Sequence, residues 1–226
     1  MTKQFLWISF LFPFFAIGQG DYYDWHLWSE AAVEYKELPK LDLGIGFQNR
    51  LDQNITRLRG NYLTLEASYK VGMGIRLIAG LRGATSPRWD QLRMSGGFSR
   101  GFDLGKNTSI KCRFLFQHQV FSGSDARYGL NLPQQNYRLR LSFRQKLVKK
   151  TWFVLHSEPM WRGDPSEIYF LRIRSSVQIE RSLPGPWSVN AGYVLQVGFN
   201  GAANFHAGLL GVTYELSFKP KTKNLR

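Results

Sequence analysis

Hydrophobic and polar residues alternate with a period of two along nearly the whole chain after residue 20. In the segment 136–147, "NYRLRLSFRQKL", apolar and aromatic side chains take most odd positions, whereas Arg138, Arg140 and Arg144 take even ones. Successive side chains of a β-strand point to opposite faces of the sheet. The segment therefore predicts a strand with one apolar face and one cationic face.

The same alternation recurs in ten other segments, and no helical periodicity of useful length follows residue 20. We expect strands centred near residues 30, 45, 66, 78, 95, 114, 141, 154, 174, 192 and 211. Short connections alternate with longer ones, which is typical of an up-and-down meander. The pattern predicts an all-β fold, with residues 19–218 forming one antiparallel up-and-down transmembrane β-barrel of 10 to 12 strands.

The odd number of segments is unexpected, because bacterial single-chain barrels favour even numbers. Two ways of reaching an even number are open. Residues 19–27 thread back or add a strand, which gives 12, or two of the segments belong to one strand, which gives 10.

Alternation alone fits a soluble barrel as well as a membrane barrel, and three features favour the membrane. The segments approach the roughly 9 to 11 residues that a tilted spanning strand needs. Several glycines fall on the charged face, which suits a crowded lumen. Aromatic residues gather at the ends of the segments, where interfacial girdles are expected: Trp25, Trp28, Tyr62, Trp89, Phe121, Tyr137, Trp152, Trp161, Trp187 and Tyr193.

The chain is strongly basic, with 30 Lys and Arg against 16 Asp and Glu. In a cytosolic protein this balance would point to nucleic acid. However, Lys3 precedes the apolar run "FLWISFLFPFFAI", and small residues follow at 16–18. This pattern predicts a signal peptide over residues 1–18, export to a bacterial outer membrane, and no nucleic-acid partner. Residues 219–226 are expected to form a short basic periplasmic tail.

Charges on the lipid side of a barrel are costly, so the charged face should point inward. More basic than acidic positions share this face. The basic lumen residues are predicted to be Arg76, Arg113, Arg138, Arg140, Arg144, Arg172 and Arg174, and the acidic ones Glu30, Glu34, Glu66, Glu180 and Glu215. Several arginines must pair with these acids or meet water. The lumen is then either filled by ion pairs or open as an anion-preferring pore.

The segment "GVTYELSF" near the C-terminus resembles the last-strand signal by which bacterial outer-membrane barrels are recognised for insertion. Its positions are Gly211, Tyr214, Leu216 and Phe218. Eight residues follow Phe218, whereas many members of this class end at the aromatic residue. The resemblance implies the barrel-assembly machinery as a partner during insertion.

Trp28, the Arg50 that closes "LGIGFQNR", "HSEPMW" around Glu158, and "LRIRSSVQIERSLPGPWSVNAGYVLQ" together resemble a family of small outer-membrane barrels. This family is common in Bacteroidetes-type bacteria and is catalogued only as a domain of unknown function (DUF2490-like). The resemblance covers nearly all of the mature chain. It implies location and fold, and it brings no catalytic residues.

Candidate chemistry is sparse. Cys112 is the single cysteine, so an internal disulfide is impossible. The four histidines lack the spacing of a zinc site, and we expect no metal and no cofactor. His156, Ser157 and Glu158 are the sharpest catalytic candidates, but neighbours on a strand point to opposite faces and cannot form one triad.

Three functions remain open. The first is a non-catalytic structural or envelope-associated barrel, the second a narrow anion-preferring channel, and the third a lipid acyl hydrolase or acyltransferase. Outer-membrane lipid and lipopolysaccharide are the expected surroundings in each case. The oligomeric state stays open.

Overall fold

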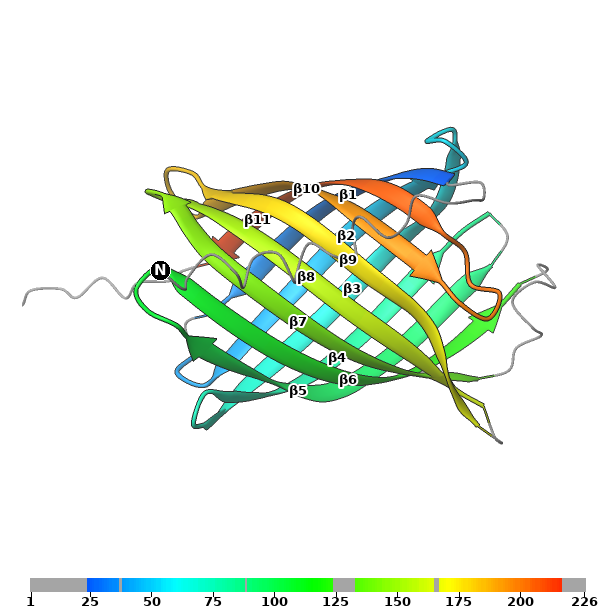
Figure 1. Cartoon of the computed structure of the whole chain (residues 1–226), viewed down its shortest axis with the longest axis horizontal. Helices are drawn as coiled ribbons and strands as arrows, with labels where there is room; N and C mark the ends of the chain where they lie inside the picture. The colour runs from blue at the N-terminus through cyan, green and yellow to red at the C-terminus, as the bar shows by residue number, and fades with distance from the viewer. Residues whose placement is uncertain (1–23, 37, 88, 124–132, 165–166, 217–226) are drawn as a thin grey trace, which may run out of the picture.

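The chain is an all-β molecule in the computed structural model, which describes residues 24–36, 38–87, 89–123, 133–164 and 167–216 (Figure 1). The eleven strands in this part of the chain are β1 (Asp24–Tyr35), β2 (Leu41–Asp52), β3 (Arg57–Gly72), β4 (Ile75–Thr85), β5 (Asp90–Asp103), β6 (Thr108–Ser122), β7 (Gln134–Val148), β8 (Thr151–Gly163), β9 (Ile168–Ser182), β10 (Trp187–Gly198) and β11 (Phe205–Leu216). Each lies on one of the eleven predicted segments. No helix among the described residues is long and apolar enough to cross a membrane.

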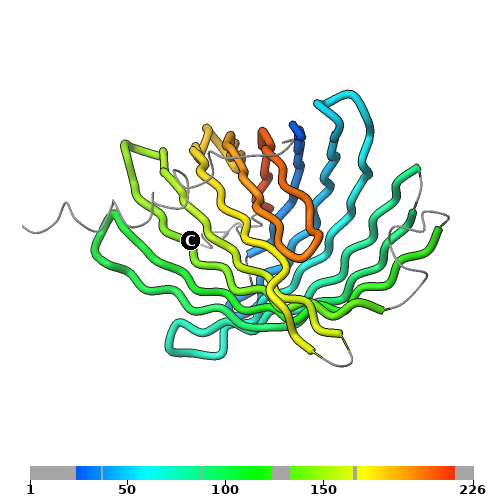
Figure 2. Tube along the Cα trace, turned by 45° about the vertical axis from the view of Figure 1, so that its right-hand side comes forward, coloured from blue at the N-terminus to red at the C-terminus, as the bar shows by residue number. Residues whose placement is uncertain are grey.

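The strands close into a single barrel, which confirms the predicted fold class (Figure 1). Consecutive strands pair antiparallel, and β1 pairs with β11 in parallel. Figure 2 shows the same closure, with the blue first strand beside the red last strand. Both routes to an even strand number were therefore wrong for the described residues. A parallel pair satisfies the two edge strands as an antiparallel pair would, so an odd number of strands closes without a free edge.

The outer face of the barrel is apolar. Large hydrophobic side chains are exposed at alternate positions of many strands, including Leu43, Ile45, Phe47, Leu63, Leu65, Leu77, Leu81, Leu92, Met94, Phe98, Leu141, Ile179, Val189 and Leu210. A soluble monomer seldom exposes so much contiguous apolar surface. The opposite parity of each strand turns polar and charged side chains to the interior.

The strands run further than the sequence pattern predicted. Their lengths are between 11 residues for β4 and 16 for β3. The segment 158–167 belongs to β8 as far as Gly163. This extension brings the side chains of Glu158 and Arg162 into the regular alternation of the wall.

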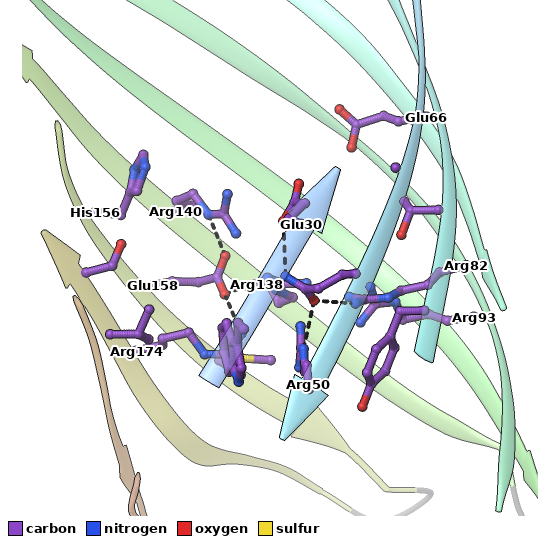
Figure 3. Close-up of a pocket in the computed structure, with 18 of the residues that line it drawn as sticks. Glu30, Arg50, Glu66, Arg82, Arg93, Arg138, Arg140, His156, Glu158 and Arg174 are labelled. Carbon is purple, nitrogen blue, oxygen red and sulfur yellow. Dashed lines mark hydrogen bonds and ion pairs between the residues drawn. The ribbon is translucent and has the colours of Figure 1, made fainter. Parts of the chain in front are cut away.

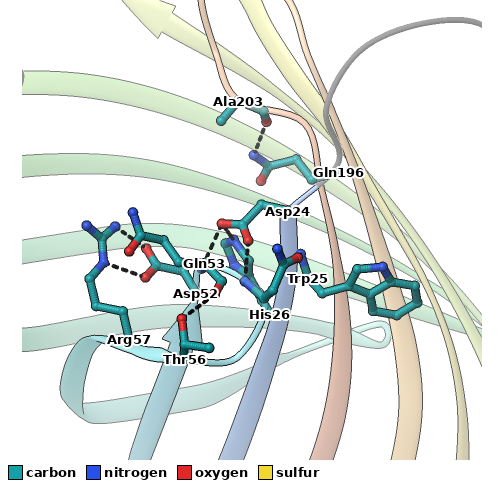
Figure 4. A network of polar contacts seen from close by, with 10 residues as sticks. Asp24, Trp25, His26, Asp52, Gln53, Thr56, Arg57, Gln196 and Ala203 are labelled. Carbon is teal, nitrogen blue, oxygen red and sulfur yellow. Dashed lines mark hydrogen bonds and ion pairs between the residues drawn. The ribbon is translucent and has the colours of Figure 1, made fainter.

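A network of hydrogen bonds fastens the beginning of β1 to the β2–β3 turn (Figure 4). The Asp24 carboxylate accepts the backbone N–H groups of Gln53 and Asn54, at 3.0 and 2.8 Å. Asp52 accepts two bonds from the Arg57 guanidinium, at 2.9 and 3.0 Å. Gln53 and Asn54 have positive φ, a conformation that such local bonds help to hold. The first strand of the closing pair is thus anchored at its start.

Gly97 gives a test of how tightly the wall is packed. A Cβ at Gly97 would lie 2.0 Å from the carbonyl oxygen of Phe114, whereas one at Gly96 would meet nothing within 4 Å. We expect Gly97→Val to lower the free energy of unfolding by about 2 kcal/mol, because overpacking forces the backbone to shift. Gly96→Val is the control and should unfold at nearly the unsubstituted midpoint. Urea unfolding in detergent, followed by heat-modifiable gel migration, measures both, and equal midpoints would contradict the packing.

The parallel closure predicts a crosslink between the two ends of the barrel. Ala32 and Thr213 are register partners across β1 and β11 and share the inner face. Neighbouring strands lie about 4.8 Å apart, within the range that a disulfide spans. In a Cys112→Ser background, we expect Ala32→Cys with Thr213→Cys to form a disulfide that peptide mass spectrometry detects. Val33→Cys with Thr213→Cys places the thiols on opposite faces and should stay reduced; a bond there instead would refute this register.

Candidate functional site

The barrel encloses a cavity of about 1170 Å³, lined by residues from all eleven strands and from the 199–204 loop. At one end the lining includes Trp89, Gln134 and Asn200. At the other end it includes Lys36 and Arg144. The cavity wall therefore extends along the length of the barrel.

Most of the predicted lumen residues lie on this wall: Arg76, Arg138, Arg140, Arg144, Arg172, Arg174, Glu30, Glu34 and Glu66. The other three contact residues that line it. Arg113 donates to Glu66 at 2.6 Å, Glu180 accepts from Arg144 at 2.8 Å, and Glu215 accepts from Lys36 at 3.2 Å. Glu34 also pairs with Lys36, and Arg76 pairs with Asp42. Glu30 accepts the side-chain amide of Gln48 at 3.0 Å, in place of the arginine expected for it.

Glu158 is the central acid of the lumen, although it is not among the predicted lumen residues (Figure 3). The residue is 3 % exposed. Oε1 accepts from Nη2 of Arg138 at 2.5 Å, and Oε2 accepts from Nε of Arg140 at 2.6 Å. Nη1 of Arg174 lies 4.0 Å from Oε1. One carboxylate thus faces three guanidinium groups. Its even position in β8, like that of His156, was the signal that pointed inward.

Aromatic rings contact further arginines. The Arg50 guanidinium lies 4.1 Å from the Trp28 ring centre and 4.5 Å from that of Tyr62. Arg82 lies 4.3 Å from the Tyr62 ring centre, and Arg174 lies 5.1 Å from that of Trp28. We call this series Arg174, Trp28, Arg50, Tyr62, Arg82 the arginine–aromatic ladder. The negative faces of the rings attract each cation and offset part of the repulsion between them.

Several aromatic residues that were predicted to lie at the membrane interface line the lumen instead. Trp28, Tyr62, Trp89 and Phe121 are buried at 5 to 9 % exposure and line the cavity. Their parity is that of the charged residues on the same strands, which overrides their position near strand ends. Trp25 and Trp187 are exposed at 49 and 46 %, as interfacial residues would be.

Six arginines on the wall have no carboxylate partner within the ranges that the structure describes: Arg50, Arg59, Arg82, Arg93, Arg162 and Arg172. Gln48 partly compensates two of them, because its Oε1 accepts from Arg50 at 2.7 Å and from Arg82 at 2.9 Å. The Nε atoms of Arg82 and Arg172 are buried without a hydrogen-bond partner among the described residues. The half of the lumen nearer the 53–56 turn therefore carries an excess of positive charge.

The catalytic candidates are not assembled into a triad. Ser157 pairs in register with Leu141 on the outer face, whereas His156 and Glu158 line the cavity. The Nδ1 atom of His156 lies 2.8 Å from Oγ of Ser142, and the Glu158 oxygens are occupied by arginines. Among the described residues, no group of three His, Cys, Asp or Glu side chains could hold a metal ion.

Two residues of the predicted insertion signal contact β10. Gly211 pairs in register with Asn190 on β10, and a Cβ at Gly211 would lie 2.1 Å from Oδ1 of Asn190. The Tyr214 ring packs edge-on against Trp187, with ring centres 4.7 Å apart. Leu216 ends β11, and Phe218 lies outside the described residues. The role of these residues in insertion stays a prediction.

No protein-family model matches the sequence, and no curated protein matches it at a significant level. Six chains of solved structures match its fold, among them a chain described as "KdgM porin". That chain is 11 % identical in sequence, with a TM-score of 0.42 over 74 % of this chain and 81 % of the other.

Glu158 should be important for stability. Replacing it with Gln leaves Arg138, Arg140 and Arg174 without their shared counter-charge, and breaking such a buried pair costs about 3 kcal/mol or more. We expect Glu158→Gln to lower the urea midpoint strongly or to prevent folding. Glu30→Gln removes the same charge from a carboxylate bound only to Gln48 among the described residues, so it should cost under about 1 kcal/mol. Comparable losses in the two variants would contradict a central role of Glu158.

Proposed function

We propose that the protein is an outer-membrane β-barrel whose lumen is an anion-preferring pore. The observation that carries this proposal is the set of six arginines without a carboxylate partner on a cavity wall that extends along the barrel.

The outer face supports a membrane location. Exposed Leu, Ile, Phe and Val residues cover the strands, and most charged residues of the same strands turn inward; Arg100 and Arg181, near strand ends, are exceptions. A Lys or Arg at the bilayer midplane on the lipid side would cost roughly 2 to 4 kcal/mol, so this separation by parity has a physical cause in lipid. Trp25 and Trp187 lie near opposite ends of the barrel wall, where aromatic girdles occur.

The charge balance favours a pore over a filled lumen. A dry filling of ion pairs would need carboxylates in numbers close to those of the guanidinium groups, because an unpaired buried charge is costly. Glu158 satisfies three arginines, yet six others lack an acid in the part of the chain that the structure describes. Water and mobile anions meet that requirement, and the same positive potential attracts anions to the lumen.

The Glu158 cluster itself favours a second candidate, a non-conducting structural barrel in which ion pairs prop the lumen. The two candidates differ in a measurable way. A folded structural barrel gives no current, whereas the pore gives discrete conductance steps.

The surroundings of the chain are part of the same proposal. Residues 1–18 would act as a cleaved signal peptide, and Gly211, Tyr214, Leu216 and Phe218 would be read by the barrel-assembly machinery. The mature barrel would lie in outer-membrane lipid and lipopolysaccharide. Membership of the DUF2490-like family is proposed on the sequence resemblance alone.

Single-channel recording in a planar bilayer under a salt gradient tests the pore. We expect an anion-selective reversal potential for the refolded protein. Arg82→Glu should lower the anion-to-cation permeability ratio about tenfold, since two charge units near a passing ion change its energy by roughly 1 to 2 kcal/mol even in water. Lys149→Glu makes the same charge change in the exposed β7–β8 turn and should leave the ratio nearly unchanged.

Two results would count against the pore. A barrel that shows heat-modifiable migration and stays silent in the bilayer would favour the structural candidate. If the barrel conducts and Arg82→Glu changes the permeability ratio no more than Lys149→Glu does, the lumen arginines do not determine the selectivity.

A further inference from the structure

Two pairs of inward arginines lie directly opposite each other in register on neighbouring strands. Arg113 on β6 faces Arg140 on β7, and Arg82 on β4 faces Arg93 on β5. Like charges opposite each other destabilise a sheet. The two pairs therefore face the same physical problem within one lumen.

The protein neutralises one pair and leaves the other uncompensated. Arg113 donates to Glu66 at 2.6 Å, and Arg140 donates to Glu158 at 2.6 Å. No carboxylate among the described residues pairs with Arg82 or Arg93. Arg82 is nonetheless held in place, because its Nη2 donates to Gln48 and its guanidinium lies 4.3 Å from the Tyr62 ring centre. A fixed, unpaired cation next to a second one is a preformed site for an anion.

Both arginines of the uncompensated pair line the cavity. The Nε atom of Arg82 is buried without a hydrogen-bond partner among the described residues. On another part of the wall, Arg138 and Arg172 flank Met160 in register on β7, β8 and β9, but Arg138 is already paired with Glu158.

We propose that the lumen holds a specific binding site for a multivalent oxyanion, formed by the uncompensated pair Arg82 and Arg93. The planar guanidinium fork matches the oxygens of phosphate and carboxylate groups, which a spherical halide cannot engage in the same way. The oxygens of one such ligand would supply the negative charge that Glu66 and Glu158 supply to the Arg113–Arg140 pair. This inference deepens the proposed pore and rests on it to the extent that the ligand enters through the same lumen.

Two kinds of ligand share this chemistry, phosphate esters or polyphosphates and polycarboxylates. Pyrophosphate and citrate are the probes that separate them. Binding of pyrophosphate alone assigns the site to phosphates, binding of citrate alone assigns it to carboxylates, and binding of both shows selection by charge number. Each of these supports the site, whereas binding of neither overturns it.

Isothermal titration calorimetry of the refolded protein in detergent, at fixed chloride concentration, measures the site. We expect saturable binding of one probe molecule per barrel. Arg93→Gln and Arg82→Gln should each weaken it about tenfold, the loss expected for one charge-assisted hydrogen-bonding partner. Arg144→Gln removes the same charge from a guanidinium paired with Glu180 elsewhere in the lumen, and should change affinity less than about threefold.

The controls separate this site from general attraction and from the pore itself. Removing Arg93 relieves repulsion, so this variant should fold, as heat-modifiable migration will show. Arg82→Gln gives a second, independent variant. Equal weakening by Arg144→Gln would overturn a local site. Anion-selective conductance without binding would overturn this inference and leave the pore intact. Binding by a barrel that never conducts would overturn the pore and leave the site.

Discussion

The backbone hydrogen bonds between β1 and β11 are the constraint on which the rest of the barrel depends. They close the sheet, so that no strand edge is left unpaired. In a closed sheet, each strand side chain points either into the lumen or to the outer face. The alternation along a single strand such as β7 then becomes a separation of the whole molecule into an apolar exterior and a charged interior.

The interior compensates its cations in two ways. Glu158, Glu66 and Glu180 neutralise arginines directly. The rings of Trp28 and Tyr62 attract others. The wall arginines with neither an acid nor a ring partner among the described residues are Arg59, Arg93, Arg162 and Arg172. The placement of acids and rings, and not only the overall basic charge of the chain, therefore decides which cations stay uncompensated.

The sequence pattern predicted the strands and the inward arginines because parity is a local property that needs no tertiary information. The pattern did not predict the direction of side chains where a bulge changes the alternation, or where nearness to a strand end was weighed above the alternation. The register shift between Arg50 and Leu51 leaves Arg59 as an extra residue of β3, and this bulge brings its side chain to the cavity against the simple alternation. Nearness to strand ends predicts Trp28 and Tyr62 at the membrane interface, whereas their alternation with the apolar outer residues predicts the lumen, where both lie. Glu158 was considered with Ser157 as a catalytic candidate, and only the partners from β7 and β9 show its electrostatic role.

An odd number of strands has a geometric consequence. In an up-and-down barrel with an even number, the first strand starts and the last strand ends at the same rim. Here β1 starts at the rim of the 53–56 turn, and β11 ends at the rim of the 149–150 turn. In a bilayer, Asp24 and Leu216 would therefore lie in different compartments. The barrel wall would then join the two compartments covalently, from the first residue of β1 to the last residue of β11.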